Sequence, residues 1–444
     1  MISRDKLESM VARDGEHFDV IVAGGGPAGL GAALAAAKVG AKTLLLEAKG
    51  YLGGVAATSL FMPWNRLLLD GGSRGPVHNA LVEKIKSYGK DASLAGKTSW
   101  IDGDGLHIHP DFLRLAALET LEDFGCRYVL YSPVSDVKMD GNRVKAVITR
   151  YKAEEARYTA NVCIDCTGDG DLAYKAGAKY EIGREGDHAT MFVTVGFALA
   201  NVDVEKLMSW FADGEKNRDE FFEILEKAEK DGYSRSLWYS FDRTTLPGVV
   251  SVNNGGLKGI GVLNAAKSYD STLAERGGLQ VAHDFVSIAR KYKIPGLENC
   301  ILERVGAALG VRETRRIMGD YVLTQEDAME DRQFEDIIAR RYGLVDNAGL
   351  DISEGTDIRN NMVPGYGYPY RGLLVAGFEN LLVAGRCGSY THLGLPAGKS
   401  MGNMTELGQA AGVAAALAVK KNKTPRELGY QEVQALLREW GVRL

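Results

Sequence analysis

The stretch FDVIVAGGGPAGLGAALAAAKVGAKTLLLE, residues 18–47, decides the fold of this chain. It opens on a short apolar and β-branched run, residues 18–23, which predicts a buried parallel strand. The glycine-rich turn 24–29 follows at once, and the Ala- and Leu-rich run 30–39 predicts a helix. A second apolar run predicts another buried strand, which ends at the acidic residue Glu47. A strand, a glycine turn, a helix, a strand and an acid in this order predict a dinucleotide-binding βαβ unit.

Each conspicuous residue of this unit has a physical task. Gly24 permits the tight turn, and Gly26 lacks a Cβ, so the backbone can approach a pyrophosphate. Gly29 lets the helix pack closely against the strand. The helix start presents free N–H groups and the positive end of its dipole to the phosphates. Glu47 is placed to accept hydrogen bonds from the ribose hydroxyls of an adenosine, and its charge disfavours a 2′-phosphate.

Three later segments extend the site beyond this unit. A glycine pair follows Glu47 in the segment YLGG, residues 51–54, where it lets the chain run close along an extended cofactor. The segment VCIDCTGDGD, residues 162–171, predicts a buried strand that enters a Gly/Asp turn. The segment NLLVAGR, residues 380–386, predicts another such strand, and a helix of small residues follows at 398–417. These segments favour FAD over NAD. Since only one complete fingerprint occurs, we expect no separate NAD(P)H domain.

These pieces, together with GVRETRRIMGDYVLT, YPYRGLL and GQAAGVAAALA, resemble the FAD-dependent oxidoreductases of the glutathione-reductase-type fold. The resemblance runs almost from end to end, and it is to the family related to the flavin subunit of heterodisulfide reductase. It implies an α/β protein, in which a Rossmann-like FAD-binding domain carries an inserted mixed α+β substrate domain. We expect the FAD-binding domain to comprise residues 15–58, 111–184 and 372–444, and the substrate domain residues 59–110 and 185–371.

Position by position, the resemblance implies a FAD site drawn from all three parts of the FAD-binding domain. The glycine turn cradles the pyrophosphate, Glu47 binds the adenosine ribose, and the backbone near Val134 meets the adenine. Residues 385–386 approach the ribityl chain. The helix that starts within 398–401 aims its N–H groups at the pyrimidine edge of the flavin, where its dipole stabilises negative charge on the reduced ring. The implied cofactor residues are Gly24, Gly26, Pro27, Ala28, Gly29, Glu47, Ala48, Gly53, Gly54, Val134, Thr167, Gly168, Gly385, Arg386, Gly398, Ser400 and Met401.

The flavin carries the redox step, so the protein's own groups orient the substrate and move protons. The loop before the last helix should face the flavin, and it contains Tyr390 and His392. The ring of His392 suits proton transfer near neutral pH, and a structural histidine bonded to the backbone is the alternative. Tyr370 is a candidate for a pocket wall or a domain seam, and Arg371 for anchoring a carboxylate or phosphate. In the basic segment RETRR, Arg312 is the best candidate for holding an anionic substrate, with structural ion pairs as the alternative.

The cysteines and histidines predict neither a disulfide framework nor a metal site. Cys163 and Cys166 form a CxxC, but they lie within a predicted strand rather than at a helix start, where a thiolate would be stabilised. Disulfide reductases of this fold carry their cysteines soon after the early glycine pair, and none stands there. We expect both thiols to pack in the core. No Cys₄ set for an iron–sulfur cluster occurs, and no histidine spacing suggests a metal.

The amino-acid composition limits the classes of binding partner that we expect. The formal net charge is -5 with acids and bases well mixed, so no basic block predicts nucleic-acid binding. No apolar stretch approaches the 18 residues of a membrane span. The first 17 residues lack the apolar region of a secretory signal, so we expect a cytoplasmic protein. We expect a small-molecule substrate and leave the oligomeric state open, with a homo-oligomer among the options.

The sequence therefore predicts an FAD-dependent oxidoreductase that transfers a hydride between a small organic substrate and the flavin. The substrate, the direction, the electron donor or acceptor and a covalent flavin link stay open. A flavin monooxygenase or halogenase is one alternative, although no characteristic halogenase Trp motif occurs. An electron-transferring flavin subunit of a larger complex is another, although the iron–sulfur cysteines that such subunits usually serve are missing.

Overall fold

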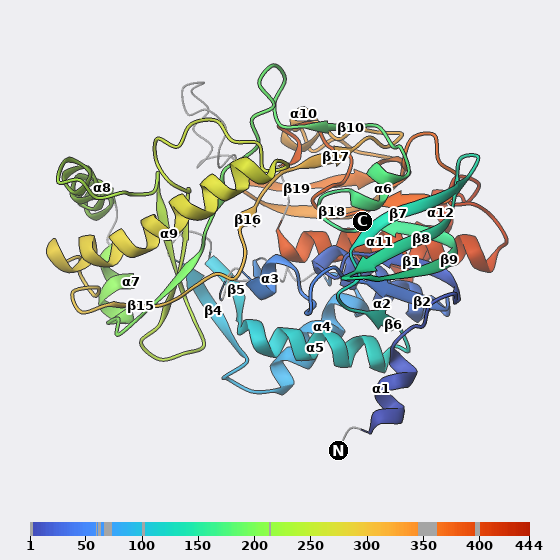
Figure 1. Cartoon of the computed structure of the whole chain (residues 1–444), viewed down its shortest axis with the longest axis horizontal. Helices are drawn as coiled ribbons and strands as arrows, with labels where there is room; N and C mark the ends of the chain where they lie inside the picture. The colour runs from blue at the N-terminus through green and yellow to red at the C-terminus, as the bar shows by residue number, and fades with distance from the viewer. Residues whose placement is uncertain are drawn as a thin grey trace.

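The computed structural model describes residues 3–58, 60, 64–65, 73–99, 103–212, 215–344, 362–395 and 400–444. Figure 1 shows two lobes side by side, one built on β1, β2 and β9 and the other on β4, β15 and the helices α7, α8 and α9. Each lobe contains a seven-stranded sheet. We call them the nucleotide lobe and the cap lobe.

The sheet of the nucleotide lobe has the strand order β6-β2-β1-β9-β8-β7, and β20 pairs with β9 as well. Its members are β1 (His17–Ala23), β2 (Thr43–Leu46), β6 (Arg127–Val129), β7 (Val134–Asp140), β8 (Arg143–Tyr151), β9 (Glu154–Asp165) and β20 (Leu381–Val383). Strands β6, β2, β1, β9 and β20 run parallel, whereas β7 and β8 form an antiparallel meander with β9. This parallel core with its meander confirms the predicted α/β fold with a Rossmann-like domain.

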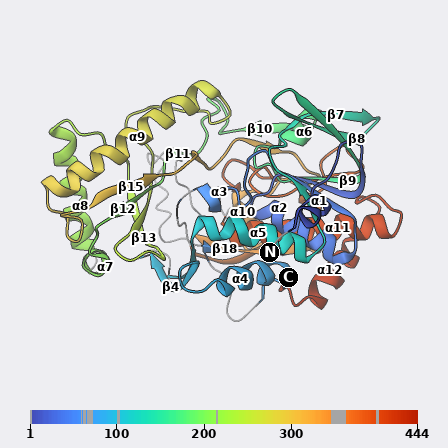
Figure 2. The same cartoon turned by 60° about the horizontal axis from the view of Figure 1, so that its bottom comes forward.

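Successive side chains along each strand point to opposite faces of this sheet, so each face has its own set of packing partners. Val20 and Val22 join the core cluster that contains the Ala-rich side of α2 (Pro27–Val39). Ile21 and Ala23 belong to a different cluster, which includes Val147 of the meander. The first face is covered by α2, α5 (Pro110–Asp123) and α11 (Met401–Lys420), and α4 (Pro76–Ser87) packs against α5 (Figure 2). Strand β1 is therefore buried on both faces, as its continuous apolar run predicts.

Helices α2 and α11 touch backbone to backbone. A Cβ on Gly408 would lie 1.9 Å from the Ala28 carbonyl oxygen, and one on Gly412 would lie 2.1 Å from that of Ala32. The two contacting pairs are separated by the same number of residues along the chain, so the helices run side by side in the same direction. Helix α11 begins at Met401, seven residues before Gly408, whereas α2 begins at Pro27, one residue before Ala28. The start of α11 therefore extends six residues further than the start of α2, which is about 9 Å at 1.5 Å per residue.

The cap-lobe sheet has the order β15-β12-β14-β13-β4-β5-β3. Its strands are β3 (Trp64–Asn65), β4 (Ser93–Ser99), β5 (Gly103–Ile108), β12 (Phe197–Ala200), β13 (Tyr239–Arg243), β14 (Val250–Asn254) and β15 (Ile301–Val305). One face is apolar: Phe241 and Val252 share a core with Phe285 of α9 (Ser268–Lys291) and with α7 (Val204–Ala212). Ser240 and Asn253 are register partners, and each is the chain neighbour of one of these apolar residues, so their side chains point to the opposite face. The second face is therefore polar.

The structure describes six further α-helices. They are α1 (Arg4–Met10), α3 (Val55–Thr58), α6 (Asp171–Lys175), α8 (Glu215–Lys230), α10 (Gln325–Met329) and α12 (Tyr430–Glu439). The described part of the chain contains no helix with the length and apolarity needed to cross a bilayer. All five cysteines are buried free thiols. The predicted domain boundaries stay a prediction, although each of the two seven-stranded sheets draws all its strands from residues within one predicted domain.

The buried His78 of α4 allows the packing around this helix to be tested by the pH dependence of the unfolding free energy. His78 is 3% exposed and lies beside Trp64. Burial, with the nearby charge of Arg74, lowers the pKa of His78 to about 3. The unfolded chain binds a proton here near pH 6.5 while the folded chain does not. Stability is therefore lost as the pH falls, by about 1.4 kcal/mol between pH 7.5 and 5.5.

We expect His78→Leu to remove this contribution, so that its unfolding free energy falls less over that interval than that of the natural chain. Urea titrations at pH 7.5 and 5.5 measure the difference. His283→Leu, at a side chain that is 75% exposed, is the control. Equal pH dependence in the natural chain and His78→Leu would contradict the expectation.

Candidate active site

Four parallel strands of the nucleotide lobe end level with one another. Ala23 of β1 is the register partner of both Leu46 of β2 and Asp165 of β9, and Asp165 also pairs with Val383 of β20. The loops that follow these strands therefore leave the sheet at one edge. The carboxyl edge of a parallel sheet is where open α/β folds bind ligands.

The first loop has two closed positions and one open position. Gly24 has φ +96°, and a Cβ there would lie 2.4 Å from the Cys166 carbonyl oxygen. A Cβ on Gly29 would lie 1.7 Å from the Gly24 carbonyl oxygen. At Gly26, by contrast, the nearest atom to an added Cβ is the Cα of Gly54, at 3.8 Å. Gly24 and Gly29 are thus required by packing, whereas Gly26 keeps an open cradle at the N-terminus of α2.

The glycine pair completes this cradle. Gly53 and Gly54 have φ +102° and +52°, a region that favours glycine. The N–H of Gly53 donates to the Gly25 carbonyl at 2.8 Å, and Gly54 lies directly against Gly26. Two backbone segments without side chains therefore line one concave surface, as an extended phosphate ligand requires.

Glu47 sits at the wall of the cradle. Its Oε2 accepts from the N–H of Gly25 at 2.6 Å, and its Oε1 accepts from that of Lys49 at 2.7 Å. Burial raises the pKa of Glu47. Each oxygen keeps a second lone pair for a ribose hydroxyl, and the exposed Ala48 lies beside it. Contact between Glu47 and a ribose stays a prediction.

The loop after β9 is shaped by a buried acid. Asp165, which is 0% exposed, accepts from the N–H and hydroxyl of Thr167 at 3.0 and 2.8 Å, and from the N–H of Ala173 at 2.8 Å. The Thr167 hydroxyl is therefore used within the turn. Gly168, with φ +78°, lies where an added Cβ would come within 3.1 Å of the Arg386 guanidinium.

The loop after β20 is tied to its neighbours. Gly385 has φ +103°, and an added Cβ would lie 3.0 Å from the Cβ of Ala28. The guanidinium of Arg386 donates to Asp169 at 2.7 Å and to the Thr314 hydroxyl at 3.0 Å. Arg386 thus holds this loop against the loop after β9. The predicted approach of both residues to a ribityl chain stays a prediction.

The start of α11 has unused hydrogen-bonding capacity. Ser400 is its N-cap residue. Among the described residues its side chain makes no capping bond, and its buried hydroxyl oxygen has no hydrogen-bond partner. Met401 opens the helix, while the predicted residue Gly398 lies outside the described residues. An orphaned hydroxyl and free N–H groups lie about 9 Å beyond the cradle, at 1.5 Å per residue. These residues fit a long ligand whose diphosphate lies at the cradle and whose polar ring lies at the start of α11.

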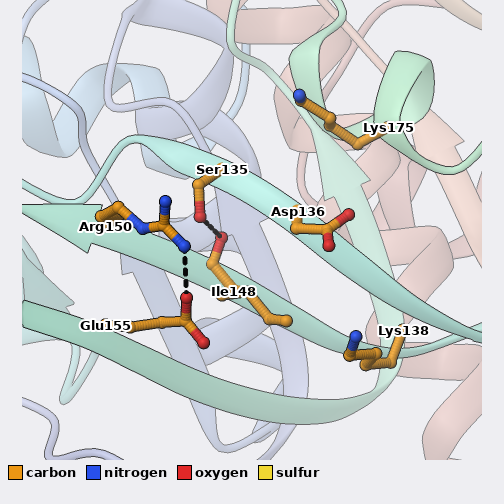
Figure 3. A pocket seen from close by; sticks show the side chains of 7 residues that line it. All are labelled: Ser135, Asp136, Lys138, Ile148, Arg150, Glu155 and Lys175. Atoms are coloured by element: carbon orange, nitrogen blue, oxygen red, sulfur yellow. Dashed lines mark hydrogen bonds and ion pairs between the residues drawn. The ribbon is translucent and has the colours of Figure 1, made fainter.

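Val134, predicted to meet the adenine, opens β7, the last strand of its sheet. Its partner is Thr149 on one side, so the other backbone edge lies outside the sheet. A hollow of about 480 Å³ lies on the same meander (Figure 3). Arg150 and Glu155 form an ion pair there at 2.7 Å. No residue from the glycine loops lines this hollow, so we do not assign it to the site.

His392 and Glu313 form a buried pair. The His392 Nδ1 lies 2.9 and 3.0 Å from the two carboxylate oxygens of Glu313. Glu313 is 0% exposed and also accepts from the Met191 N–H at 3.0 Å and from Arg316 at 3.2 Å. A carboxylate can only accept, so the geometry assigns a proton to Nδ1 and directs the ring through that nitrogen, leaving Nε2 as the nitrogen that does not face Glu313.

Three consecutive residues connect this pair to both lobes. Arg312 reaches Asn253 of the cap sheet at 3.5 Å, and its guanidinium lies 5.7 Å from the Trp238 ring. The next residue, Glu313, holds His392. Thr314 then donates to Asp169 at 2.6 Å. One short segment thus aligns the cap sheet, the histidine and the loops of the nucleotide lobe.

The other predicted catalytic residues occupy structural positions. The Tyr370 hydroxyl donates to the Pro425 carbonyl at 2.7 Å, and Arg371 pairs with Asp336 at 2.9 Å. Tyr390 is fully buried and donates to the Gly385 carbonyl at 3.3 Å. None of these arrangements brings Tyr370 or Arg371 to the edge of the parallel strands. Their catalytic roles stay predictions.

Sequence reasoning did not single out two of the residues that organise the site. Glu313 contacts His392, and Asp169 pairs with Arg386. The available signal was weak: an acid in the middle of RETRR, and an acid in a turn rich in acids. Among the described residues, no group of three His, Cys, Asp or Glu side chains has a metal-binding arrangement.

The comparisons with known proteins agree with this geometry. The model of a family described as FAD dependent oxidoreductase matches residues 19–437. The tRNA uridine 5-carboxymethylaminomethyl modification enzyme MnmG of Campylobacter fetus subsp. fetus (strain 82-40) is 24% identical over 257 residues, 54% of this chain and 39% of that protein. The chain thus spans well under half of that relative.

Two solved structures share the fold. The flavin-dependent brominase Bmp2 is 12% identical, with a TM-score of 0.51 over 96% of this chain and 83% of that one. The p-nitrophenol 4-monooxygenase PnpA from Pseudomonas putida DLL-E4 is also 12% identical, with a TM-score of 0.50 over 96% and 84%. At this identity the likeness concerns the fold alone.

Gly26 has room for a Cβ and Gly29 does not, so we expect different results when each is replaced by alanine. Gly26 has φ −75°, which alanine tolerates, so Gly26→Ala should fold normally. Its methyl group would stand where a phosphate contacts backbone N–H groups, and we expect the affinity for FAD to fall at least about 100-fold. Flavin-fluorescence titration measures the affinity and urea titration the fold.

Gly29→Ala is the matched contrast, since its methyl group would collide with the Gly24 carbonyl. We expect this variant to lose stability as well as FAD. If Gly26→Ala bound FAD as tightly as the natural chain, the cradle would not be the phosphate site.

Proposed function

This chain belongs to the FAD dependent oxidoreductase family, as its sequence predicts, and we propose that it oxidises or reduces a small organic substrate by two electrons, with His392 and Glu313 moving the substrate proton. The family identifies the chain as an enzyme with FAD as its cofactor. Bound FAD would supply the hydride chemistry. Gly26, Gly53 and Gly54 would hold its diphosphate, and the start of α11 its ring.

The buried His392–Glu313 pair is the observation that carries the proposal. Glu313 fixes the imidazole through Nδ1, so the Nε2 lone pair is ready to take a proton from a substrate O–H or N–H. The protonated ring is stabilised by the same carboxylate and can return the proton in the opposite direction. A base oriented by a buried acid is a common device for proton transfer.

The polar face of the cap sheet supports a place for the substrate. Asn253 and Ser240 share that face, and Arg312 meets Asn253 at its edge. Arg312 is also the chain neighbour of Glu313, so an anion at Arg312 would lie close to His392. A guanidinium is suited to a carboxylate or phosphate because its donors form a planar fork. We therefore propose a substrate with an anionic end.

An anaerobic bleaching screen tests the proposal. The purified yellow holoenzyme is mixed with alcohols, amines and sugars, each with and without a carboxylate, and loss of the visible flavin band is followed. We expect carboxylate-bearing compounds to bleach fastest. If no compound bleaches the enzyme, and the reduced enzyme instead oxygenates or halogenates an aromatic compound, the reaction assigned here is wrong.

The proton-transfer role predicts a specific loss. We expect His392→Gln to lower kcat/KM about 10²- to 10⁴-fold, the usual contribution of a general acid or base, with FAD content unchanged. Glu313→Gln should cost less, because the ring remains but loses the acceptor that orients it. Stopped-flow bleaching against pH is the measurement. His283→Gln, on the exposed side of α9, is the control.

The anion-binding role of Arg312 predicts a change in binding rather than in rate. We expect Arg312→Gln to raise the apparent Kd of an acidic substrate about 10- to 100-fold, as loss of charged hydrogen bonds implies. The limiting bleaching rate should stay close to that of the natural enzyme. Arg276→Gln, at an exposed arginine of α9, is the control. An equal effect on the matched amide of the substrate would rule out charge recognition.

A further inference from the structure

Glu313 is shared between His392 and a second partner, Arg316. Arg316 lies on β17 (Arg315–Ile317), and its side chain is 1% exposed. Its Nη1 donates to Oε1 of Glu313 at 3.2 Å, and the same oxygen lies 3.0 Å from Nδ1 of His392. Because arginine keeps its proton in proteins, the carboxylate that orients the histidine also faces a permanent positive charge.

Backbone contacts fix Arg316 beside the acid. Its Nη2 donates to the Gly183 carbonyl at 2.9 Å, and β17 pairs with β10 (Tyr180–Ile182), the strand that leads into Gly183 (Figure 1). Gly183 has φ +60°, and an added Cβ would lie 2.4 Å from a carbonyl oxygen across the turn. The same stretch of chain returns at Met191, whose N–H donates to Oε2 of Glu313. One tight turn therefore holds both the arginine and the acid.

Charged side chains on the neighbouring elements have contacts of their own. Those of the described residues are Arg312–Asn253, Arg315–Asp171, Arg386–Asp169 and Arg332–Asp327. Glu181 of β10 lies 3.5 Å from the Arg316 Nη2, but its side chain is 60% exposed, so water screens its charge. Arg316 is therefore the buried charge in direct contact with the acid of the His392–Glu313 pair.

The histidine and the arginine compete for one carboxylate. When Nε2 of His392 takes a proton, the ring becomes a second cation beside Glu313. The two contacts at Oε1 keep the Arg316 Nη1 and the His392 Nδ1 within about 6 Å of each other, the greatest separation that they allow. In a buried site, repulsion at that distance moves a protonation equilibrium by about 1 to 2 pH units. Arg316 thus makes the protonated ring less stable.

We propose that Arg316 is a positioning residue of the proton-transfer site, which draws on the charge of Glu313 and so keeps the ring of His392 free to accept a proton near neutral pH. The inference rests on the proposed function in taking His392 as the base. A base must also give its proton back in each cycle, and the cation behind the acid favours that release. Arg316 acts through Glu313 and needs no contact with substrate or FAD.

The test follows the protonation of His392 directly in the FAD-loaded protein. Histidine is labelled with ¹³C, and the ring signal of His392 is identified by its absence from His392→Gln and titrated against pH. We expect Arg316→Gln and Arg316→Met each to raise the midpoint by about 1 to 2 pH units, and Arg316→Lys to stay within about half a unit of the natural protein. Arg235→Gln is the matched control, because this arginine is also buried, at 8% exposed, but pairs with Glu229.

Glu181→Gln gives a prediction of the opposite sign. Loss of this negative charge strengthens the field of Arg316 at the pair, so the His392 midpoint should fall by a few tenths of a unit, about the size of an exposed ion pair's effect. Glu181 is exposed, so its replacement leaves the packing intact. Thermal unfolding and flavin content report the fold, and this variant decides the matter if the neutral variants of Arg316 are unstable.

A kinetic readout follows from the same shift. With the compound that bleaches the holoenzyme fastest, the acid limb of the bleaching rate against pH should move upward in Arg316→Gln by as much as the ring titration does. The rate at high pH should stay close to that of the natural enzyme. A merely structural role would lower the rate at every pH instead.

Two results would overturn the inference. One is an unchanged His392 midpoint in the folded neutral variants, or in Glu181→Gln where those do not fold. The other is an equal rise for Arg316→Lys and Arg316→Gln, which would indicate packing instead of charge. Failure of the proposed function is separate: if His392→Gln still bleached at the natural rate, His392 would not be the base, yet its ring titration would still report the action of Arg316.

Discussion

Close contact between backbones, with no side chain between them, is the constraint on which this molecule depends. The Gly29 Cα meets the Gly24 carbonyl, and Gly408 meets that of Ala28, at distances that exclude any Cβ. These contacts press α2 onto the loop after β1 and press α11 onto α2. Two parallel helix starts are thereby held at different heights above one sheet edge, with their positive dipole ends facing the same way. A ligand with two electron-rich ends about 9 Å apart, at 1.5 Å per residue, matches this arrangement.

Acidic side chains supply the second level of order. Asp165 shapes one loop, Asp169 receives Arg386 from another, and Glu313 orients His392. Asp165 and Glu313 are buried, and each accepts from several donors, as a buried carboxylate must. The loops at the carboxyl edge are therefore fixed relative to one another by side chains that need not touch a ligand. Arg386 illustrates this, because its guanidinium donates to Asp169 and Thr314.

The sequence predicted the nucleotide lobe well because its signals are local. The strand, glycine turn and helix of residues 18–39 lie next to one another in the chain, and their packing needs no distant partner. The pair His392–Glu313 is different: 79 residues separate its members, and only the folded chain brings them together. Tyr370 and Arg371 are a different case. Their residue types suggest chemistry, and in the fold their polar groups contact Pro425 and Asp336, so their catalytic roles stay predictions.

The segment between β16 (Gly310–Val311) and β17 (Arg315–Ile317) explains how two lobes can share one site. Both strands pair with segments that lead into the cap lobe, β11 (Val193–Thr194) and β10 (Tyr180–Ile182). Between them Arg312, Glu313 and Thr314 contact the cap sheet, the histidine and the cofactor loops in turn. Any displacement of the cap sheet against the parallel sheet must strain these three contacts together. The position of His392 is therefore coupled to the position of the cap, and substrate binding and proton transfer are organised by one short piece of chain.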